Sequence, residues 1–284
     1  IGVLLLPNAS FTSDHLTVDA SGAGPVVTGV TSMSGNVHAE FGSSSTINAK
    51  GGAAAINIMG VASTGNDQFI GTQLTINADG SNSPNSNVYG LYLYGAGVSN
   101  TNLGTNSTIT VKGGAVNNKL VSGIHAMGSA TVTADHLTIE VSDGMLNSSG
   151  YINGVSITGT NNSIDLGVGS TIHMVGYGTT GINAYGANNL LKAKGLSITG
   201  ARNAVSVDNS ARVEITDGSH LEGIRGGASV INSGSILIKD SEIVLHSDSG
   251  GTSGALQSSG SGALIEAENV KITSDNSNYT IGLY

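Results

Sequence analysis

Histidines and carboxylates are the side chains of this sequence that could carry acid–base or metal chemistry. Enzymes that cleave polysaccharides need clustered carboxylates for calcium or proton transfer, together with a basic residue. Here the acidic residues are mostly single, and the seven histidines show none of the close spacings of metal ligands. The sequence also lacks G-x-S-x-G, a phosphate-binding loop and the calcium-binding nonapeptide repeat. We therefore expect no catalytic residue, no metal and no cofactor.

The stretch GLYLYG, residues 90–95, suggests a binding surface instead. In a strand, Leu91 and Leu93 would point to one side, and Tyr92 and Tyr94 to the other. Similar Gly-led stretches begin near residues 29, 55, 123, 154 and 181. Aligning AINIMG (55–60) and the others with GLYLYG predicts an outward strip of tyrosines and methionines: Met33, Met59, Tyr92, Tyr94, Met127 and Tyr185. Such side chains are typical of binding surfaces. The alternative interpretation, which we favour, is that they pad the core at a corner, half covered by the next loop.

Basic residues are concentrated in one quarter of the chain, which contains six of the ten. The alternation in LLKAKG and RVEIT turns Lys192, Lys194 and Arg212 outward on consecutive repeats. Such a row could bind sulfates or carboxylates of an acidic polysaccharide. The alternative, which we favour, is a solvated face whose charge is balanced by neighbours such as Glu214 and Asp217.

Threonines recur in a second type of repeat, read as LTI or TIT. Alignment of these stretches predicts an outward column of hydroxyl groups: Thr17, Thr75, Thr110, Thr138 and Ser197. Like side chains in register can hydrogen-bond up a stack, so structure alone accounts for the column. The same flat polar face could also associate with a copy of itself, which makes Thr75, Thr110 and Thr138 candidates for self-association.

These candidate sites require short strands, and the repeats predict them. Gly-led and LTI-type stretches alternate along the whole chain, with starts about every 22 to 35 residues, which is a solenoid period. Each unit alternates apolar and polar residues between turns rich in Gly, Asn, Ser and Asp, as GIHAM, ATVTA and LTIEV do in residues 123–141. We predict an all-β, right-handed parallel β-helix with three strands per coil and about ten coils. Residues 78–87 are the most obvious protruding loop.

Composition agrees with one such domain over residues 1–284. The chain has 43 glycines, no cysteine, 10% charged residues and ordinary hydrophobicity, which argues against disorder. No linker or change of composition divides it. The net charge of −9 disfavours nucleic acid and anionic membranes as partners.

The alternating G-apolar-x-apolar-x-G and LTI units, rich in Gly, Ser, Thr and Asn and free of Cys, resemble the passenger region of Gram-negative autotransporter adhesins. The resemblance is to the self-associating and diffuse-adherence type. It implies export to the cell surface through a C-terminal β-barrel, which would lie outside this chain, and it makes the chain a fragment of a longer passenger. It also implies attachment to host glycans or matrix proteins, or aggregation between cells and biofilm formation. A secreted polysaccharide lyase or hydrolase is the first alternative, since an active site can be assembled from separate coils, and a structural stalk is the second.

Overall fold

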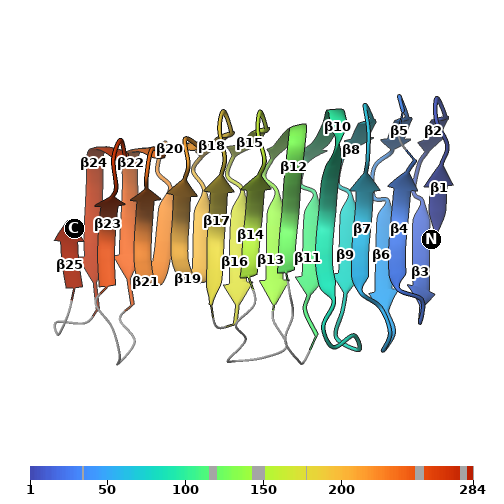
Figure 1. Cartoon of the computed structure of the whole chain (residues 1–284), viewed down its shortest axis with the longest axis horizontal. Helices are drawn as coiled ribbons and strands as arrows, with labels where there is room; N and C mark the ends of the chain where they lie inside the picture. Colours follow the sequence, from blue (N-terminus) through green and yellow to red (C-terminus); the bar gives the residue numbers. More distant parts are fainter. Residues whose placement is uncertain are drawn as a thin grey trace.

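The fold is a parallel β-helix, seen in a computed structural model that describes residues 1–33, 35–114, 120–142, 151–176, 178–246, 253–275 and 280–283. Every element in these residues is a strand, and every pairing is parallel. Each coil of the chain adds strands to three faces, and the two termini lie at opposite ends of the solenoid (Figure 1). No helix of the described residues is long and apolar enough to cross a membrane.

The three faces share some strands, because several long strands turn a corner from one face to the next. The first face consists of β1 (Val3–Leu5), β4 (Val26–Ser32), β7 (Asn57–Ser63), β10 (Asn87–Thr105), β12 (Leu120–Asp135), β14 (Tyr151–Thr158), β17 (Thr179–Tyr185), β19 (Ser197–Asp208), β21 (His220–Ile231), β23 (Ser253–Ser259) and β25 (Thr280–Leu283). The second face consists of β2 (Ser10–Ser13), β5 (His38–Phe41), β8 (Gln68–Gly71), the second parts of β10 and β12, β15 (Ser163–Val168), β18 (Leu190–Lys194), β20 (Arg212–Thr216), β22 (Ser235–Leu245) and β24 (Leu264–Ser274). The third face consists of β3 (Thr17–Gly22), β6 (Thr46–Gly51), β9 (Thr75–Asp79), β11 (Thr108–Lys112), β13 (Thr138–Ser142), β16 (Thr171–Val175), the first parts of β19 and β21, and the second parts of β22 and β24.

The number of coils follows from the third face. Nine parallel pairings connect its described strands in series, so the chain completes about nine turns. The predicted all-β parallel β-helix with three strands per coil is therefore confirmed, and the predicted number of coils is close.

The core is a stack of aliphatic side chains inside the coils. On the third face one residue per coil points inward and pairs in register with its neighbours, all of them buried: Val18, Ile47, Ile76, Ile109, Ile139, Ile172, Ile198, Leu221 and Ile243. No coil buries these side chains alone, because each packs against the coils before and after it.

A row of glycines on the first face packs against this aliphatic column, and we call this row the glycine ladder. Its members are Gly29, Gly60, Gly90, Gly123, Gly154, Gly181 and Gly227. A Cβ at any of them would lie 2.2–2.6 Å from the Cγ2 atom of an isoleucine on the third face. It would also lie 2.5–2.7 Å from the carbonyl oxygen of the next coil. The ladder is therefore needed for space, since two faces of the solenoid approach each other more closely than a side chain allows.

Two coils carry alanine in place of the ladder glycine. Ala204 occupies the ladder position, since the Cβ of an alanine at 181 would meet its carbonyl oxygen at 2.6 Å. In the same coil the aliphatic column carries Leu221, which has no branch at Cβ. Ala255 takes the ladder position in another coil, since a Cβ at Gly227 would lie 2.5 Å from its carbonyl oxygen. The aliphatic column of that coil carries Ile272, which pairs with Ile243 and is partly exposed.

The corner before the third face alternates leucine and serine. The residues are Leu16, Ser45, Leu74, Ser107, Leu137, Ser170, Leu196 and Ser219. Each leucine N–H donates to the serine Oγ of the next coil, at 2.9–3.2 Å. Each serine in turn donates to a carbonyl of its own coil, at 2.6–3.1 Å. The alternation lets a buried corner satisfy its backbone donors, which would otherwise destabilise the fold.

The loop predicted at residues 78–87 is a real connection between β9 and β10, but it is anchored to the solenoid. Ser83 and Ser86 are fully buried. Ser83 Oγ donates to the Gly52 carbonyl at 2.7 Å, and the Gly80 N–H donates to the Lys112 carbonyl at 2.8 Å. The loop therefore packs against the coils on either side of it.

The close approach at the glycine ladder makes a testable prediction about stability. We expect Gly123→Ala to destabilise the fold by about 1–3 kcal/mol, the usual cost of overpacking a core. Its Cβ would lie 2.3 Å from Ile139 Cγ2. Adding Ile139→Leu should recover part of the loss, because it removes the branch that Leu221 also lacks. Urea unfolding followed by circular dichroism measures both effects, and an unchanged midpoint for Gly123→Ala would contradict the role of the ladder.

Candidate ligand-binding face

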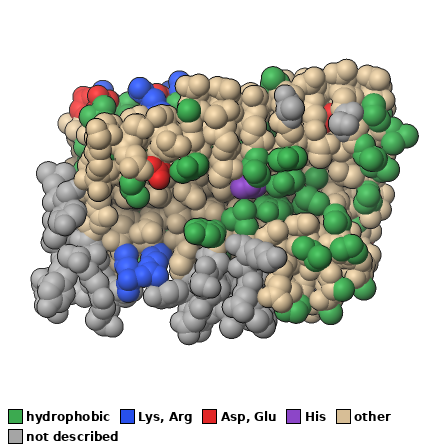
Figure 2. All heavy atoms as spheres, in the orientation of Figure 1, with side chains coloured by type: hydrophobic (Ala, Val, Ile, Leu, Met, Phe, Trp, Pro, Cys, Tyr) green, Lys and Arg blue, Asp and Glu red, His purple; other side chains and the backbone are tan. Residues whose placement is uncertain are grey.

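Outward side chains of the first face form a column of apolar groups near the corner with the second face. Tyr94 pairs with Met127, and Met127 pairs with Thr158. Tyr185 lies in line with them, because Ala184 pairs with Ile157 one position earlier. Tyr94 is 53% exposed and Tyr185 48%. Figure 2 shows hydrophobic side chains gathered on the face in view, most densely toward the N-terminal half.

Met33 continues this column and Met59 does not. Thr31 and Tyr92 occupy the same column, because both pair with Ala62. Met33 lies two residues after Thr31, as Tyr94 lies two residues after Tyr92, and it is 54% exposed. Met59 instead pairs with Tyr89, so its predicted place beside Tyr94 is wrong.

The reason for the error is Gly60. The alignment treated it as the closing glycine of AINIMG, equivalent to Gly95. In the structure Gly60 is a member of the glycine ladder and stacks against Gly90. Residues 55–60 are therefore displaced along the strand relative to the alignment with GLYLYG that the sequence suggested.

Four rings of the first face pack together, and we call them the ring cluster: Tyr89, Tyr92, Tyr94 and His125. Tyr94 belongs to both the ring cluster and the apolar column. The centroids of Tyr92 and His125 are 5.7 Å apart with the ring planes at 9°, and those of Tyr92 and Tyr94 are 6.1 Å apart at 15°. Tyr89 contacts both Tyr92 and His125, at 4.7 and 5.3 Å. Tyr92 is half-buried, so of the two predicted tyrosines only Tyr94 is largely open to solvent.

Tyr89 is the ring that sequence reasoning missed. It directly precedes a ladder glycine, and it is only 6% exposed although it lies on the outward column with Met59. The sequence NVYG, residues 87–90, shows a tyrosine directly before a glycine. An outward position in a strand, however, does not by itself predict that the side chain is buried.

Burial shifts the pKa of three of the four ring-cluster residues toward the uncharged form. It raises the pKa of the Tyr89 and Tyr92 hydroxyls above the ordinary value and lowers the pKa of His125 to about 4. His125 Nδ1 is buried without a hydrogen-bond partner, as are Ser122 Oγ and Asn153 Nδ2 in the same region. These polar atoms are buried and do not form part of the exposed surface.

A hollow of about 310 Å³ lies beside the exposed ring of Tyr94. Its lining consists of Tyr94, Gly95, Met127, Gly128 and Gly159. Tyr94 and Met127 belong to the apolar column, and the three glycines are the corner residues that directly follow this column. The hollow thus lies along the direction in which the coils stack.

The predicted basic row is exposed, as expected, and acidic side chains accompany it. Arg212 Nε lies 2.7 Å and Lys192 Nζ 3.6 Å from the carboxylate of Glu214. Lys194 Nζ lies 3.6 Å from the carboxylate of Asp217. This is the balanced arrangement that we favoured from the sequence, with Glu214 and Asp217 as the partners.

The threonine column lies on the outer side of the third face, with one correction. Thr75 pairs with Thr108, and Thr108 pairs with Thr138. The prediction placed Thr110 in this column, but Thr110 pairs with Asn77 and Glu140 in the neighbouring one. The stretch TIT offers two threonines for this column, Thr108 and Thr110. Ile109, between them, aligns with Ile76 of the aliphatic column, and this register places Thr108 beside Thr75. A role in self-association stays a prediction.

Amide side chains connect the neighbouring column of the third face. Asn77 Nδ2 donates to Asn48 Oδ1 at 2.7 Å, and Asn48 Nδ2 donates to Asp19 Oδ1 at 2.6 Å. A hollow of about 400 Å³ on this face is lined by Asn48, Ala49, Lys50, Asn77, Ala78, Asp79, Thr110 and Lys112. Its cations are partly neutralised, since Lys50 Nζ lies 3.6 Å from Asp79.

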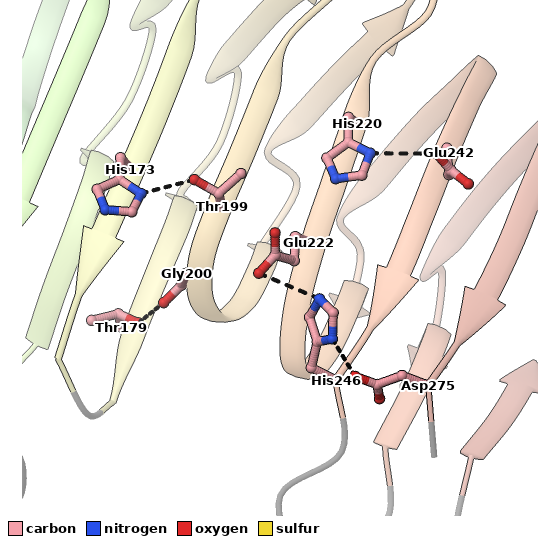
Figure 3. Close-up of polar contacts among 9 residues, drawn as sticks. All are labelled: His173, Thr179, Thr199, Gly200, His220, Glu222, Glu242, His246 and Asp275. Carbon is pink, nitrogen blue, oxygen red and sulfur yellow. Dashed lines mark hydrogen bonds and ion pairs between the residues drawn. The ribbon is translucent and has the colours of Figure 1, made fainter. Parts of the chain in front are cut away.

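Histidines of the C-terminal coils bind carboxylates (Figure 3). His246 lies between Glu222 and Asp275, with its two ring nitrogens 3.4 and 2.6 Å from their oxygens. His220 lies 3.5 Å from Glu242, which also contacts Lys271. Both ring nitrogens of His246 are therefore occupied. In the part of the chain that the structure describes, no group of three or more His, Asp or Glu side chains could hold a metal ion.

The buried imidazole makes a prediction about pH. The folded-state pKa of His125, about 4, is below its ordinary value of 6.5, so the folded state resists protonation. Its contribution to stability is complete above pH 6.5 and is lost as the pH falls toward 4, at roughly 1.4 kcal/mol per pH unit. We expect His125→Phe to lose less thermal stability than the native chain between pH 7 and 4. If the melting temperatures of the two proteins fell equally between pH 7 and 4, the lowered pKa of His125 would be contradicted, since the other titrating groups are common to both.

The basic row makes a prediction about acidic polysaccharides. If Glu214 and Asp217 neutralise it, Glu214→Gln with Asp217→Asn should increase retention on heparin at low salt. The triple variant Lys192→Ala, Lys194→Ala and Arg212→Ala should abolish that retention. Binding should weaken steeply with salt, because exposed charges are screened within about 8 Å at physiological ionic strength. Unchanged elution of all the variants would remove this row as a binding surface.

Comparison with known proteins gives one informative similarity. No family model matches the chain, and no solved structure matches it. The chain is 31% identical over 290 residues to a probable autotransporter of Escherichia coli strain K12. The match covers 98% of this chain and 27% of the relative, so the chain spans about a quarter of that protein's length. The similarity and the β-solenoid confirm the resemblance that the repeats predicted: the chain is consistent with the passenger domain of an autotransporter.

Proposed function

We propose that this chain is the surface-displayed part of a bacterial adhesin, exported across the outer membrane. It would attach the cell to host glycans or matrix proteins, or attach cells to one another in aggregates and biofilms. Two findings support the display at the surface: the E. coli relative is a probable autotransporter, and the fold is a β-solenoid.

The observation that carries the proposal is the exposed apolar column of the first face. Met33, Tyr94 and Tyr185 each leave about half of a large side chain in water, on one line along the solenoid. Exposed apolar groups forgo about 25 cal/mol per Å² of buried area. Aromatic and methionine side chains are enriched at binding interfaces. A partner that covers the column would gain that free energy.

The two other hypotheses have less in their favour. A structural stalk does not need exposed rings on one face. A polysaccharide lyase or hydrolase needs a free acid or base, and the histidine with the closest carboxylate contacts, His246, has both nitrogens engaged. No observation in the described residues favours catalysis, so we propose that the chain acts without it.

Display on cells tests the adhesin. We expect the triple variant Met33→Ser, Tyr94→Ala and Tyr185→Ala to reduce attachment and settling several-fold, with little change in melting temperature, because these side chains lie outside the core. A matched control is Val168→Ser with Val175→Ser, which removes side chains of similar exposure, 50% and 49%, from the second and third faces. Equal loss in both variants would contradict a role specific to the first face. Full adhesion by the triple variant would overturn the proposal for this column.

A further inference from the structure

We propose that the hollow beside Tyr94 is a binding site for a neutral saccharide. This inference rests on the proposed function and deepens it, since it names one site and one class of ligand. The site would hold a sugar against the exposed ring of Tyr94 and over the backbone of Gly95, Gly128 and Gly159.

The backbone keeps the hollow open. Gly95, Gly128 and Gly159 all have positive φ angles, of 154°, 94° and 80°, at the corner between the first and second faces. A Cβ at Gly95 would lie 2.5 Å from the Thr64 carbonyl oxygen, and a Cβ at Gly128 would lie 2.5 Å from the Gly95 carbonyl oxygen. Other residues would be strained and would collide there. The floor of the hollow is therefore bare backbone, which a ligand can approach closely.

The ring of Tyr94 is held in place before any ligand binds. It stacks on Tyr92, which stacks on His125, and Tyr89 packs against both of these. Little side-chain freedom is left to lose, and preorganisation of this kind increases affinity. An exposed tyrosine ring offers an apolar surface with a polar tip. The C–H face of a pyranose ring suits such a surface.

The lining favours a small uncharged ligand that also forms hydrogen bonds. None of the five lining residues carries a charge. The polar groups available to a ligand are the Tyr94 hydroxyl and the bare backbone of the three glycines. A saccharide combines an apolar ring face with several hydroxyl groups, and therefore fits both the ring of Tyr94 and these polar groups.

Size argues against a protein in this hollow. The volume of about 310 Å³ is at the lower end of the range for small-molecule sites. A stable protein interface needs about 800 Å² from each partner, far more than five residues supply. The coils repeat at about 4.8 Å, so a linear saccharide could extend along the column from one coil to the next.

The experiment uses the purified chain and a panel of neutral oligosaccharides of glucose, galactose and N-acetylglucosamine, with binding followed by ligand-observed NMR and calorimetry. We expect at least one oligosaccharide to bind and Tyr94→Ala to weaken that binding at least tenfold. Tyr151→Ala is the matched control, since that tyrosine is exposed but lies outside the apolar column and does not line the hollow. It should bind as the native chain does. Both variants should keep the native melting temperature.

Two further results would overturn the inference. They are the absence of binding by every oligosaccharide in the panel, or equal binding by Tyr94→Ala and the native chain. The same variants displayed on cells separate this inference from the proposed function. Adhesion without saccharide binding would contradict only the hollow as a sugar site. Saccharide binding without adhesion or aggregation would contradict only the adhesin.

Discussion

The close approach between the glycine ladder and the aliphatic column is the constraint on which the rest of the structure depends. At each ladder position a single added carbon would overlap both an isoleucine Cγ2 and a carbonyl oxygen of the next coil. Shape complementarity of this kind specifies register, because a shift of one residue would place a side chain where only hydrogen fits. In the coil where Ala204 takes the ladder position, the aliphatic column carries Leu221 in place of isoleucine. The outward columns inherit their alignment from this contact, including the line from Tyr94 to Met127.

The corners complete the coils by satisfying polar groups inside the solenoid. Between the first and second faces Asp67 is buried, and it accepts hydrogen bonds from Ser63 Oγ at 2.9 Å and from the Val37 N–H at 3.2 Å. Farther along the same corner Asn162 Nδ2 donates to Asn189 Oδ1 at 2.9 Å. Such groups are costly when unpaired and stabilising when paired. These corner contacts hold the backbone beside the apolar column, where the glycines leave the hollow.

Much of the fold could be predicted from the sequence, because every repeat carries the same pattern of short strands and turns. Period-two strands, turn residues and the order of the two repeat types predicted a parallel β-helix, and the structure has one. Register within a repeat was harder to predict. Met59 was misplaced because GLYLYG offers two glycines with which Gly60 could align, and Thr110 was misplaced because TIT offers two threonines. Only contacts between distant parts of the chain distinguish the two choices. The burial of Tyr89 and His125 was also hidden, since it depends on packing between adjacent coils. Charge balance around Lys192 was predictable, because its partner follows at the next coil.

We propose above that the first face is the contact surface of a β-helical adhesin. The absence of cysteine makes a direct measurement practical, because a single introduced thiol is unique in the chain. Met33→Cys places an accessible thiol on the apolar column of the first face, and Val175→Cys places one of similar exposure on the third face. Each variant would be displayed on cells, labelled with a bulky maleimide and assayed for attachment before and after labelling. We expect the label at 33 to abolish attachment and the label at 175 to leave it unchanged. Attachment that survives the label at 33, or is lost only with the label at 175, would contradict the proposal.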